Sequence, residues 1–161
     1  MLKNINIPYE EYLSVSELTV DEQDLVNQAK KSAVLSYAPY SNFHVGAALL
    51  LDDGNVIIGN NQENAAFPSG LCAERVAIFS ALSKFPAKRI KKIAITAFSD
   101  EIPVDDPVTP CGSCRQVIAE TEKRQSEKIR VIMTGKTGKV IVIEGVDSLL
   151  PFVFNPGKLK K

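Results

Sequence analysis

The segment "TPCGSCRQ", residues 109–116, places Cys111 and Cys114 three residues apart, directly after a proline and ahead of a run with helical character. The third and last cysteine, Cys72, lies in "GLCAERVAI" (70–78) and also follows a loop marked by proline and glycine. Residues i and i+3 share a helical face, and the free N–H groups of a helix N-terminus favour thiolate over thiol. Two such helix starts that face each other would present three thiolates to one point, which suits zinc.

The number of available ligands indicates an enzyme. Structural zinc sites are normally closed by four protein ligands, whereas catalytic sites keep a position open for water. The only histidine, His44, begins a predicted strand well before Cys72, and nothing in the sequence suggests it as a fourth ligand. Glu74 points away from Cys72 on the helix, so it is expected to reach a zinc-bound water, whose pKa falls to about 7, and to move its proton. Arg75 is expected to hydrogen-bond the sulfurs and draw off their charge.

Two other interpretations of the cysteines stay open at this point. They could be small buried hydrophobic residues, or they could form a closed structural zinc site with a fourth ligand. An odd number of cysteines, two of them only three apart, fits a disulfide framework poorly. Metal binding or a catalytic thiol in a reducing compartment fits better, so we expect a cytoplasmic protein.

Length and composition bound the remaining possibilities. The 161 residues are expected to form a single domain, residues 1–161. Nineteen basic and nineteen acidic residues give zero net charge, which argues against nucleic acid as a partner. No stretch approaches 18 uninterrupted apolar residues, so no membrane span is expected, and the first residues do not resemble a secretory signal.

Hydrophobic periodicity and turn residues predict an α/β protein. "TVDE" (19–22) reads as a capping box that starts a helix to about Ser36. A second helix is predicted at 71–85, and because it is apolar nearly all round from Val76 to Leu82, we expect it to be a buried central helix. Two further helices are predicted at 111–123 and 146–154. Strands are predicted at 44–51, 55–60, 91–98, 130–135 and 139–144. This order predicts a mixed five-stranded sheet with helices on both faces, preceded by an arm, residues 1–18, with no assigned element.

Four segments together resemble the small zinc-dependent cytidine deaminases that use three cysteine ligands. They are "YAPYSNFHVGAALL" (37–50), "GNNQENAAFPSGLCAERVAIFSAL" (59–82), "TPCGSCRQVIAE" (109–120) and "SLLPFVF" (148–154), in the family's order. The resemblance implies a cytidine deaminase-like three-layer α-β-α fold. It also implies hydrolytic deamination of cytidine and deoxycytidine, as in pyrimidine salvage, with Glu74 as a glutamate that is not a ligand. The small members of the family are commonly homotetramers whose active sites are shared between subunits.

The resemblance also assigns individual positions. It makes Cys72, Cys111 and Cys114 the ligands of one zinc ion per subunit and Glu74 the proton shuttle. The remaining implied contacts are Asn61 and Glu63 with the ribose 3′-hydroxyl, Phe43 beside the nucleoside, the Ala73 N–H with the pyrimidine carbonyl, the Thr109 carbonyl with the 4-amino group, and Phe154 with a neighbouring subunit's site. Without the resemblance, Asn61 and Glu63 would be read as turn residues, and Phe43 and Phe154 as core aromatics.

Two competing functions are weighed against this one. A related zinc deaminase, such as one acting on blasticidin S, shares the metal motif, although "NQEN" (61–64) favours the ribose binders. Deaminases of polynucleotides usually use histidine as the first ligand and need a basic groove, whereas this chain has Cys72 at that position and no surplus of basic residues. A rival of another class is a zinc-binding module without catalytic activity.

Overall fold

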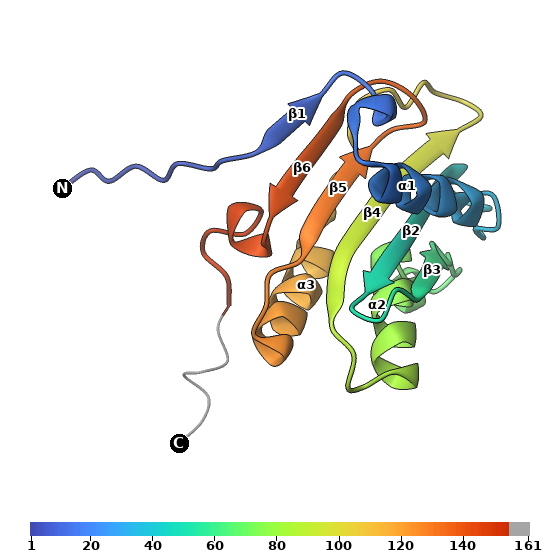
Figure 1. Ribbon diagram of the computed structural model, residues 1–161. Helices are drawn as coiled ribbons and strands as arrows, with labels where there is room; N and C mark the ends of the chain where they lie inside the picture. The colour runs from blue at the N-terminus through green and yellow to red at the C-terminus, as the bar shows by residue number, and fades with distance from the viewer. Residues whose placement is uncertain (155–161) are drawn as a thin grey trace.

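One six-stranded mixed sheet organises residues 1–154, which are the part of the chain that the computed structural model describes (Figure 1). Its spatial order is β1-β6-β5-β4-β2-β3. β4 and β5 pair in parallel and every other neighbouring pair is antiparallel. The strands are β1 (Glu10–Tyr12), β2 (Phe43–Leu51), β3 (Val56–Asn60), β4 (Ile90–Ser99), β5 (Arg130–Thr134) and β6 (Val140–Glu144).

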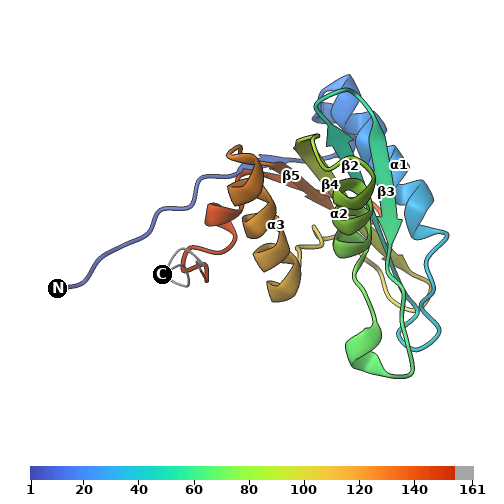
Figure 2. The same cartoon turned by 90° about the horizontal axis from the view of Figure 1, so that it is seen from below.

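Helices cover both faces of the sheet, which confirms the predicted three-layer α/β architecture. α1 (Val20–Ala33) packs on one face through a buried cluster that includes Leu25, Val26 and Ala29. α2 (Ala73–Lys84) and α3 (Gly112–Gln125) lie next to each other on the opposite face (Figure 2). Three short 3₁₀ turns complete the described chain: η1 (Val15–Glu17), η2 (Phe67–Ser69) and η3 (Val146–Ser148).

The prediction of five strands was wrong, because the N-terminal arm contributes a sixth. β1 pairs antiparallel with β6 at the sheet edge, with Glu11 opposite Ile141. Two ion pairs hold it there: Arg130 Nη1 lies 2.8 Å from Glu10 Oε1, and Lys139 Nζ lies 2.9 Å from Glu11 Oε1. Arg130 and Lys139 are far from Glu10 and Glu11 in the sequence, so the local pattern of three residues could not predict the strand.

The start of α1 follows the predicted capping box. Glu22 reaches back so that the Thr19 backbone N–H donates to its Oε2 at 3.4 Å. The helix ends at Ala33, shortly before the predicted end at Ser36. Its packing on β2 is close: a Cβ on Gly46 would lie 2.0 Å from the carbonyl oxygen of Ala29.

α2 is held against β3 by a second close approach, and this fixes the helix that begins at Cys72. A Cβ on Gly59 would lie 2.5 Å from the backbone nitrogen of Ala77, so only glycine fits there. Ala77, Ile78 and Ala81 are buried. The expectation of burial all round this helix was wrong for the single chain, since Phe79 is 47% exposed.

The predicted helix at 146–154 was also wrong in extent. Only η3 forms, and Pro151, which has no N–H to donate, follows it. Among residues 1–154, no helix is both long and apolar enough to cross a membrane.

Candidate active site

The two cysteine motifs meet at the N-termini of α2 and α3, as the sequence predicts. Cys72 is the N-cap residue of α2, Cys111 is the N-cap residue of α3, and Cys114 lies in the first turn of α3. The Sγ atoms of Cys72 and Cys111 are 3.8 Å apart, and those of Cys111 and Cys114 are 3.5 Å apart. All three sulfurs lie within 4.8 Å of one another. Tetrahedral zinc with Zn–S bonds of about 2.3 Å requires sulfurs about 3.8 Å apart, so the group fits a zinc ion.

The charges of the three thiols are interdependent. Hydrogen bonding with Cys114, helped by the Arg75 guanidinium and by Cys111, lowers the pKa of Cys72 to about 5 despite its partial burial. The hydrogen bond with Cys72, followed by burial and by the negative charges of Glu74 and Cys72, raises the pKa of Cys114. All three sulfurs would be thiolates only with a cation among them, and a divalent metal would supply that charge.

Arg75, which the sequence analysis expected to hydrogen-bond the sulfurs, contacts the sulfur of Cys72. Its Nη2 donates to Cys72 Sγ at 3.6 Å, and this contact raises the pKa of the guanidinium. The Nε atom of Arg75 is buried without a hydrogen-bond partner among the described residues. An arginine held at a thiolate withdraws charge from it, which tunes a metal bound by that sulfur.

Glu74 is a buried carboxyl group beside this cluster, with 4% of its surface exposed. Burial is the largest influence on its pKa and raises it, and the charge of Cys72 adds to the rise. A raised pKa makes the carboxylate a stronger proton acceptor than that of an exposed glutamate, which suits general acid–base catalysis.

Cys72, Cys111 and Glu74 line a cavity of about 720 Å³, which is large enough for a small organic ligand. Most of the predicted site residues line its wall. They are Phe43, Asn61, Glu63, Cys72, Glu74, Arg75, Thr109 and Cys111. Ala73 and Cys114 are fully buried behind this wall. As the first residue of α2, Ala73 has a backbone N–H without a partner inside the helix, as an acceptor on a ligand would require.

Asn61 and Glu63 use their side chains within the protein as well as facing the cavity. Asn61 Oδ1 accepts from the Val45 N–H at 2.8 Å, and Asn61 Nδ2 donates to the Phe43 carbonyl at 2.9 Å. Glu63 accepts hydrogen bonds from the turn that precedes Phe43. The two residues therefore hold β2 and the preceding turn in place at one end of the cavity.

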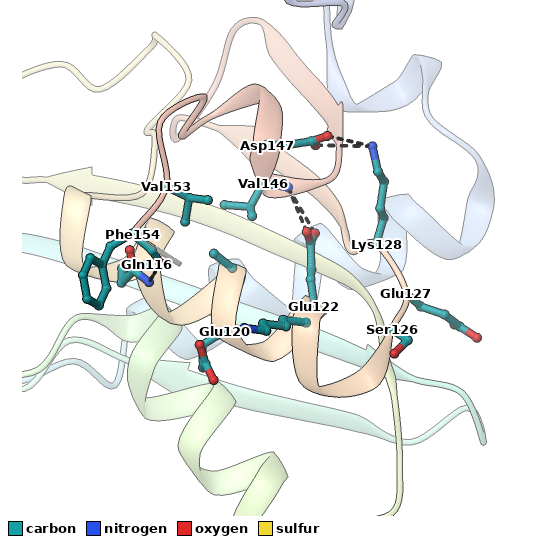
Figure 3. Close-up of a pocket in the computed structure, with 12 residues that line it drawn as sticks. Gln116, Glu120, Glu122, Ser126, Glu127, Lys128, Val146, Asp147, Val153 and Phe154 are labelled. Carbon is teal, nitrogen blue, oxygen red and sulfur yellow. Dashed lines mark hydrogen bonds and ion pairs between the residues drawn. The ribbon is translucent and has the colours of Figure 1, made fainter. Parts of the chain in front are cut away.

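Phe154 is the predicted site residue that the structure does not bring to this cavity. Its backbone carbonyl accepts from Gln116 Nε2 at 3.1 Å, and its ring, 64% exposed, lies on the outer side of α3 (Figure 3). There it borders a second cavity, of about 400 Å³, between α3 and η3.

Several of the polar groups that line this second cavity are engaged in hydrogen bonds and ion pairs with neighbouring elements. Glu122 accepts a hydrogen bond from the Ile129 N–H at 2.8 Å. It also accepts one from the Val146 N–H at 3.1 Å, and Lys128 is paired with Asp147 at 3.0 Å (Figure 3). These groups tie η3 to α3 and to the start of β5. Among residues 1–154, the cysteine group is the set of three or more side chains suited to a metal ion.

Sequence reasoning did not single out several residues on the wall of the cysteine cavity. Tyr40 and Phe67 line it with ring centroids 5.9 Å apart in an edge-to-face arrangement, and Ser41 also lines it. A tyrosine and a serine after a proline read as ordinary turn residues, so the local pattern carries no signal for a ligand-facing role.

Comparison with known proteins agrees with this geometry. Residues 19–129 match the family model described as the cytidine and deoxycytidylate deaminase zinc-binding region. The cytidine deaminase of Sporosarcina psychrophila is 45% identical over 101 residues, which cover 63% of this chain and 70% of that protein. The cytidine deaminase of Halalkalibacterium halodurans is 46% identical over 101 residues, covering 63% of this chain and 72% of that protein.

Solved structures show the same fold. The crystal structure of cytidine deaminase from Burkholderia pseudomallei superposes with a TM-score of 0.71 and 39% identity, covering 85% of this chain and 100% of that one. The cytidine deaminase of Mycobacterium tuberculosis gives a TM-score of 0.64 and 30% identity, covering 85% and 99%. With three thiols placed for zinc and a buried glutamate beside them, the chain belongs to the cytidine and deoxycytidylate deaminase zinc-binding family.

Proposed function

We propose that this protein catalyses the hydrolytic deamination of cytidine and deoxycytidine to uridine and deoxyuridine, with release of ammonia. The observation that carries the proposal is the group of three cysteine sulfurs, all within 4.8 Å of one another, beside a cavity whose wall includes Cys72, Cys111 and the buried carboxyl group of Glu74. Three ligands leave a tetrahedral metal one position for water, as in catalytic rather than structural zinc sites.

Cys72, Cys111 and Cys114 would hold one zinc ion. When bound there, zinc supplies a Lewis acid that lowers the pKa of a water molecule to about 7. Two helix N-termini and the Arg75 guanidinium surround the sulfurs, and both stabilise their negative charge. The chain therefore fits the ion both in spacing and in charge.

Glu74 would carry the protons of the reaction. It accepts a proton from the water that adds at C4 of the pyrimidine, delivers it to N3, and assists the departure of ammonia from C4. One water and one nucleoside thus give one uridine and one ammonia. Burial of Glu74 supports this role, because a carboxyl group shielded from solvent exchanges protons with a weakly basic ring nitrogen more readily.

The cavity wall supplies groups for the nucleoside. Phe43 would lie against the base, with the Ala73 N–H donating to the pyrimidine carbonyl and the Thr109 carbonyl accepting from the 4-amino group. Asn61 and Glu63 would bind the 3′-hydroxyl of the sugar. The support is that Phe43, Asn61, Glu63 and Thr109 line one cavity with the cysteines.

We further propose a cytoplasmic enzyme of pyrimidine salvage that consists of one domain and assembles as a homotetramer. One sheet unites the N-terminal arm, through β1, with the strands that carry the site, which supports a single domain. Phe79 and Phe154 are exposed on the single chain, and burial between subunits would remove these rings from water. Phe154 would then reach a neighbouring subunit's site rather than its own.

The test is cytidine turnover by purified protein whose zinc content is measured on the same sample. The proposal predicts stoichiometric formation of uridine and ammonia by the wild type. Glu74→Gln should lose at least about 100-fold in kcat while it keeps its zinc, because it lacks the proton-transfer group. Zinc-loaded wild type that leaves cytidine unchanged, or a Glu74→Gln variant of undiminished activity, would contradict it.

A further inference from the structure

The turn before β2 is bound to the segment after β3 by a set of hydrogen bonds centred on Glu63. In the backbone, the Tyr37 N–H donates to the Asn61 carbonyl at 3.0 Å, and the Glu63 N–H donates to the Tyr37 carbonyl at 2.8 Å. The Glu63 side chain then turns toward the same turn, where the Tyr40 and Ser41 N–H groups donate to Oε2 at 2.9 and 3.3 Å. One carboxylate oxygen is therefore held by two backbone donors.

The hydroxyl group of Ser41 engages the other oxygen. Ser41 Oγ donates to Glu63 Oε1 at 2.5 Å and accepts from the Phe43 N–H at 3.1 Å. A single hydroxyl thus connects the carboxylate of Glu63 to the backbone of Phe43, and both of these residues line the cavity. Ser41 itself also lies on the cavity wall and is exposed.

These hydrogen bonds keep the Glu63 side chain ionised and fix its orientation. The hydrogen bond from Ser41, followed by those from the Tyr40 and Ser41 backbone, lowers the pKa of Glu63, so the group is a carboxylate at neutral pH. Each carboxylate oxygen can accept about two hydrogen bonds. Among the described residues, Oε1 has one donor, Ser41, so it has capacity for one more from a ligand hydroxyl.

We propose that Ser41 is a positioning residue for the sugar end of the cavity: its hydroxyl fixes Glu63 Oε1 in the orientation that receives the nucleoside's 3′-hydroxyl. This inference rests on the proposed function, and it adds a residue that acts on the sugar through Glu63. The Tyr40 and Ser41 N–H groups anchor the carboxylate, and the Ser41 hydroxyl sets its rotation.

Removal of the hydroxyl should show in substrate binding rather than in chemistry. In Ser41→Ala, Glu63 keeps its two backbone donors but loses the one that orients Oε1, so we expect kcat/KM for cytidine to fall about 10-fold, mostly through KM. Ser41→Thr retains the hydroxyl at an exposed position with room for a methyl group, so it should stay within about threefold of wild type. Ser83 is an exposed serine on α2 away from the cavity, so Ser83→Ala is the matched control and should leave kcat/KM for cytidine unchanged.

The decisive comparison uses three nucleosides that differ only in the sugar. The Ser41→Ala loss should appear with cytidine and 2′-deoxycytidine and should vanish with 3′-deoxycytidine, which has no hydroxyl for Glu63 to accept. In a Glu63→Gln background, Ser41→Ala should cost little more, because coupled residues are not additive. A merely structural serine would instead lower turnover of all three nucleosides alike, and that result would overturn the inference.

Failure of the inference is distinguishable from failure of the proposed function. If the wild type does not deaminate cytidine, the proposed function fails before any variant is compared. If the wild type is active, then equal losses with all three nucleosides, an unchanged Ser41→Ala, or a Ser41→Thr as impaired as Ser41→Ala would each overturn the role of Ser41. Urea unfolding midpoints of the variants, measured beside the kinetics, identify an alanine variant that fails to fold, and the threonine variant then carries the test.

Discussion

Replacement of Glu22 by glutamine should destabilise the fold without touching the cavity. Glu22 lies in the first turn of α1 and is 4% exposed. Its Oε1 is 3.0 Å from Lys92 Nζ on β4 and 2.8 Å from Arg130 Nε on β5. The carboxylate therefore joins the helix to two strands of the sheet.

The magnitude follows from what remains after the charge is removed. Loss of one partner of a buried ion pair costs about 3–5 kcal/mol when the other charge is left uncompensated. Here Lys92 keeps Asp21 at 2.7 Å, and Arg130 keeps Glu10 and Glu144 at 2.8 and 2.6 Å. The amide oxygen of glutamine also still accepts one hydrogen bond, so we expect a loss of about 2 kcal/mol in the free energy of unfolding at pH 7.

The same contact makes stability depend on pH. Burial raises the pKa of Glu22, but the hydrogen bonds from Lys92 and Arg130 outweigh it and hold the pKa below its usual value of 4.5. The unfolded state therefore binds the proton first on acidification, and the stabilisation from Glu22 is present above about pH 4.5 and is lost as pH falls below it. The difference in the free energy of unfolding between wild type and Glu22→Gln should therefore decrease as pH falls below about 4.5.

Urea unfolding followed by circular dichroism between pH 3 and pH 7 measures both effects. Glu120→Gln, a change at an exposed position on α3, is the control and should leave the free energy of unfolding within about 0.5 kcal/mol of wild type. A Glu22→Gln protein as stable as wild type at pH 7, or a difference that grows on acidification, would refute the reasoning.

Three other changes test the support of the site. Gly59→Ala should lower the free energy of unfolding by about 1–3 kcal/mol, because its Cβ would meet the Ala77 nitrogen at 2.5 Å; an unchanged urea midpoint would contradict the close packing of α2 on β3. Arg75→Gln should weaken zinc affinity about 10–100-fold in competition with a chromophoric chelator, since it removes the charge beside Cys72 Sγ, and equal affinity would argue against that role. Removal of zinc by a chelator should lower the thermal midpoint, and zinc but not magnesium should restore it, because thiolates suit zinc whereas magnesium prefers oxygen; a midpoint indifferent to chelation would count against a zinc that stabilises the fold.

Local patterns predicted the parts of the structure that depend on local physics. The capping box at Thr19 and Glu22 places the start of α1 because its partners are three residues apart. The cysteine motifs place the metal site because each lies at the start of its own helix, and the sequence shows both starts. We expected the N-termini of these two helices to lie together, and the structure confirms that the cysteines at the starts of α2 and α3 do so.

Long-range contacts account for what the sequence did not reveal. β1 depends on Arg130 and Lys139, which are 120 and 128 residues away from their partners Glu10 and Glu11. Ser41 owes its role to Glu63, 22 residues further along the chain, so its place on the cavity wall could not be read from the turn alone. The exposure of Phe79 likewise depends on which face of α2 meets the sheet.

X-ray absorption at the zinc edge of the purified protein tests the central claim most directly. We expect one zinc per chain, bound by three sulfurs at about 2.3 Å and one oxygen at about 2.0 Å. The oxygen would be that of a water molecule in the fourth position. Four sulfurs, a nitrogen ligand in place of the oxygen, or protein that binds no zinc would contradict it.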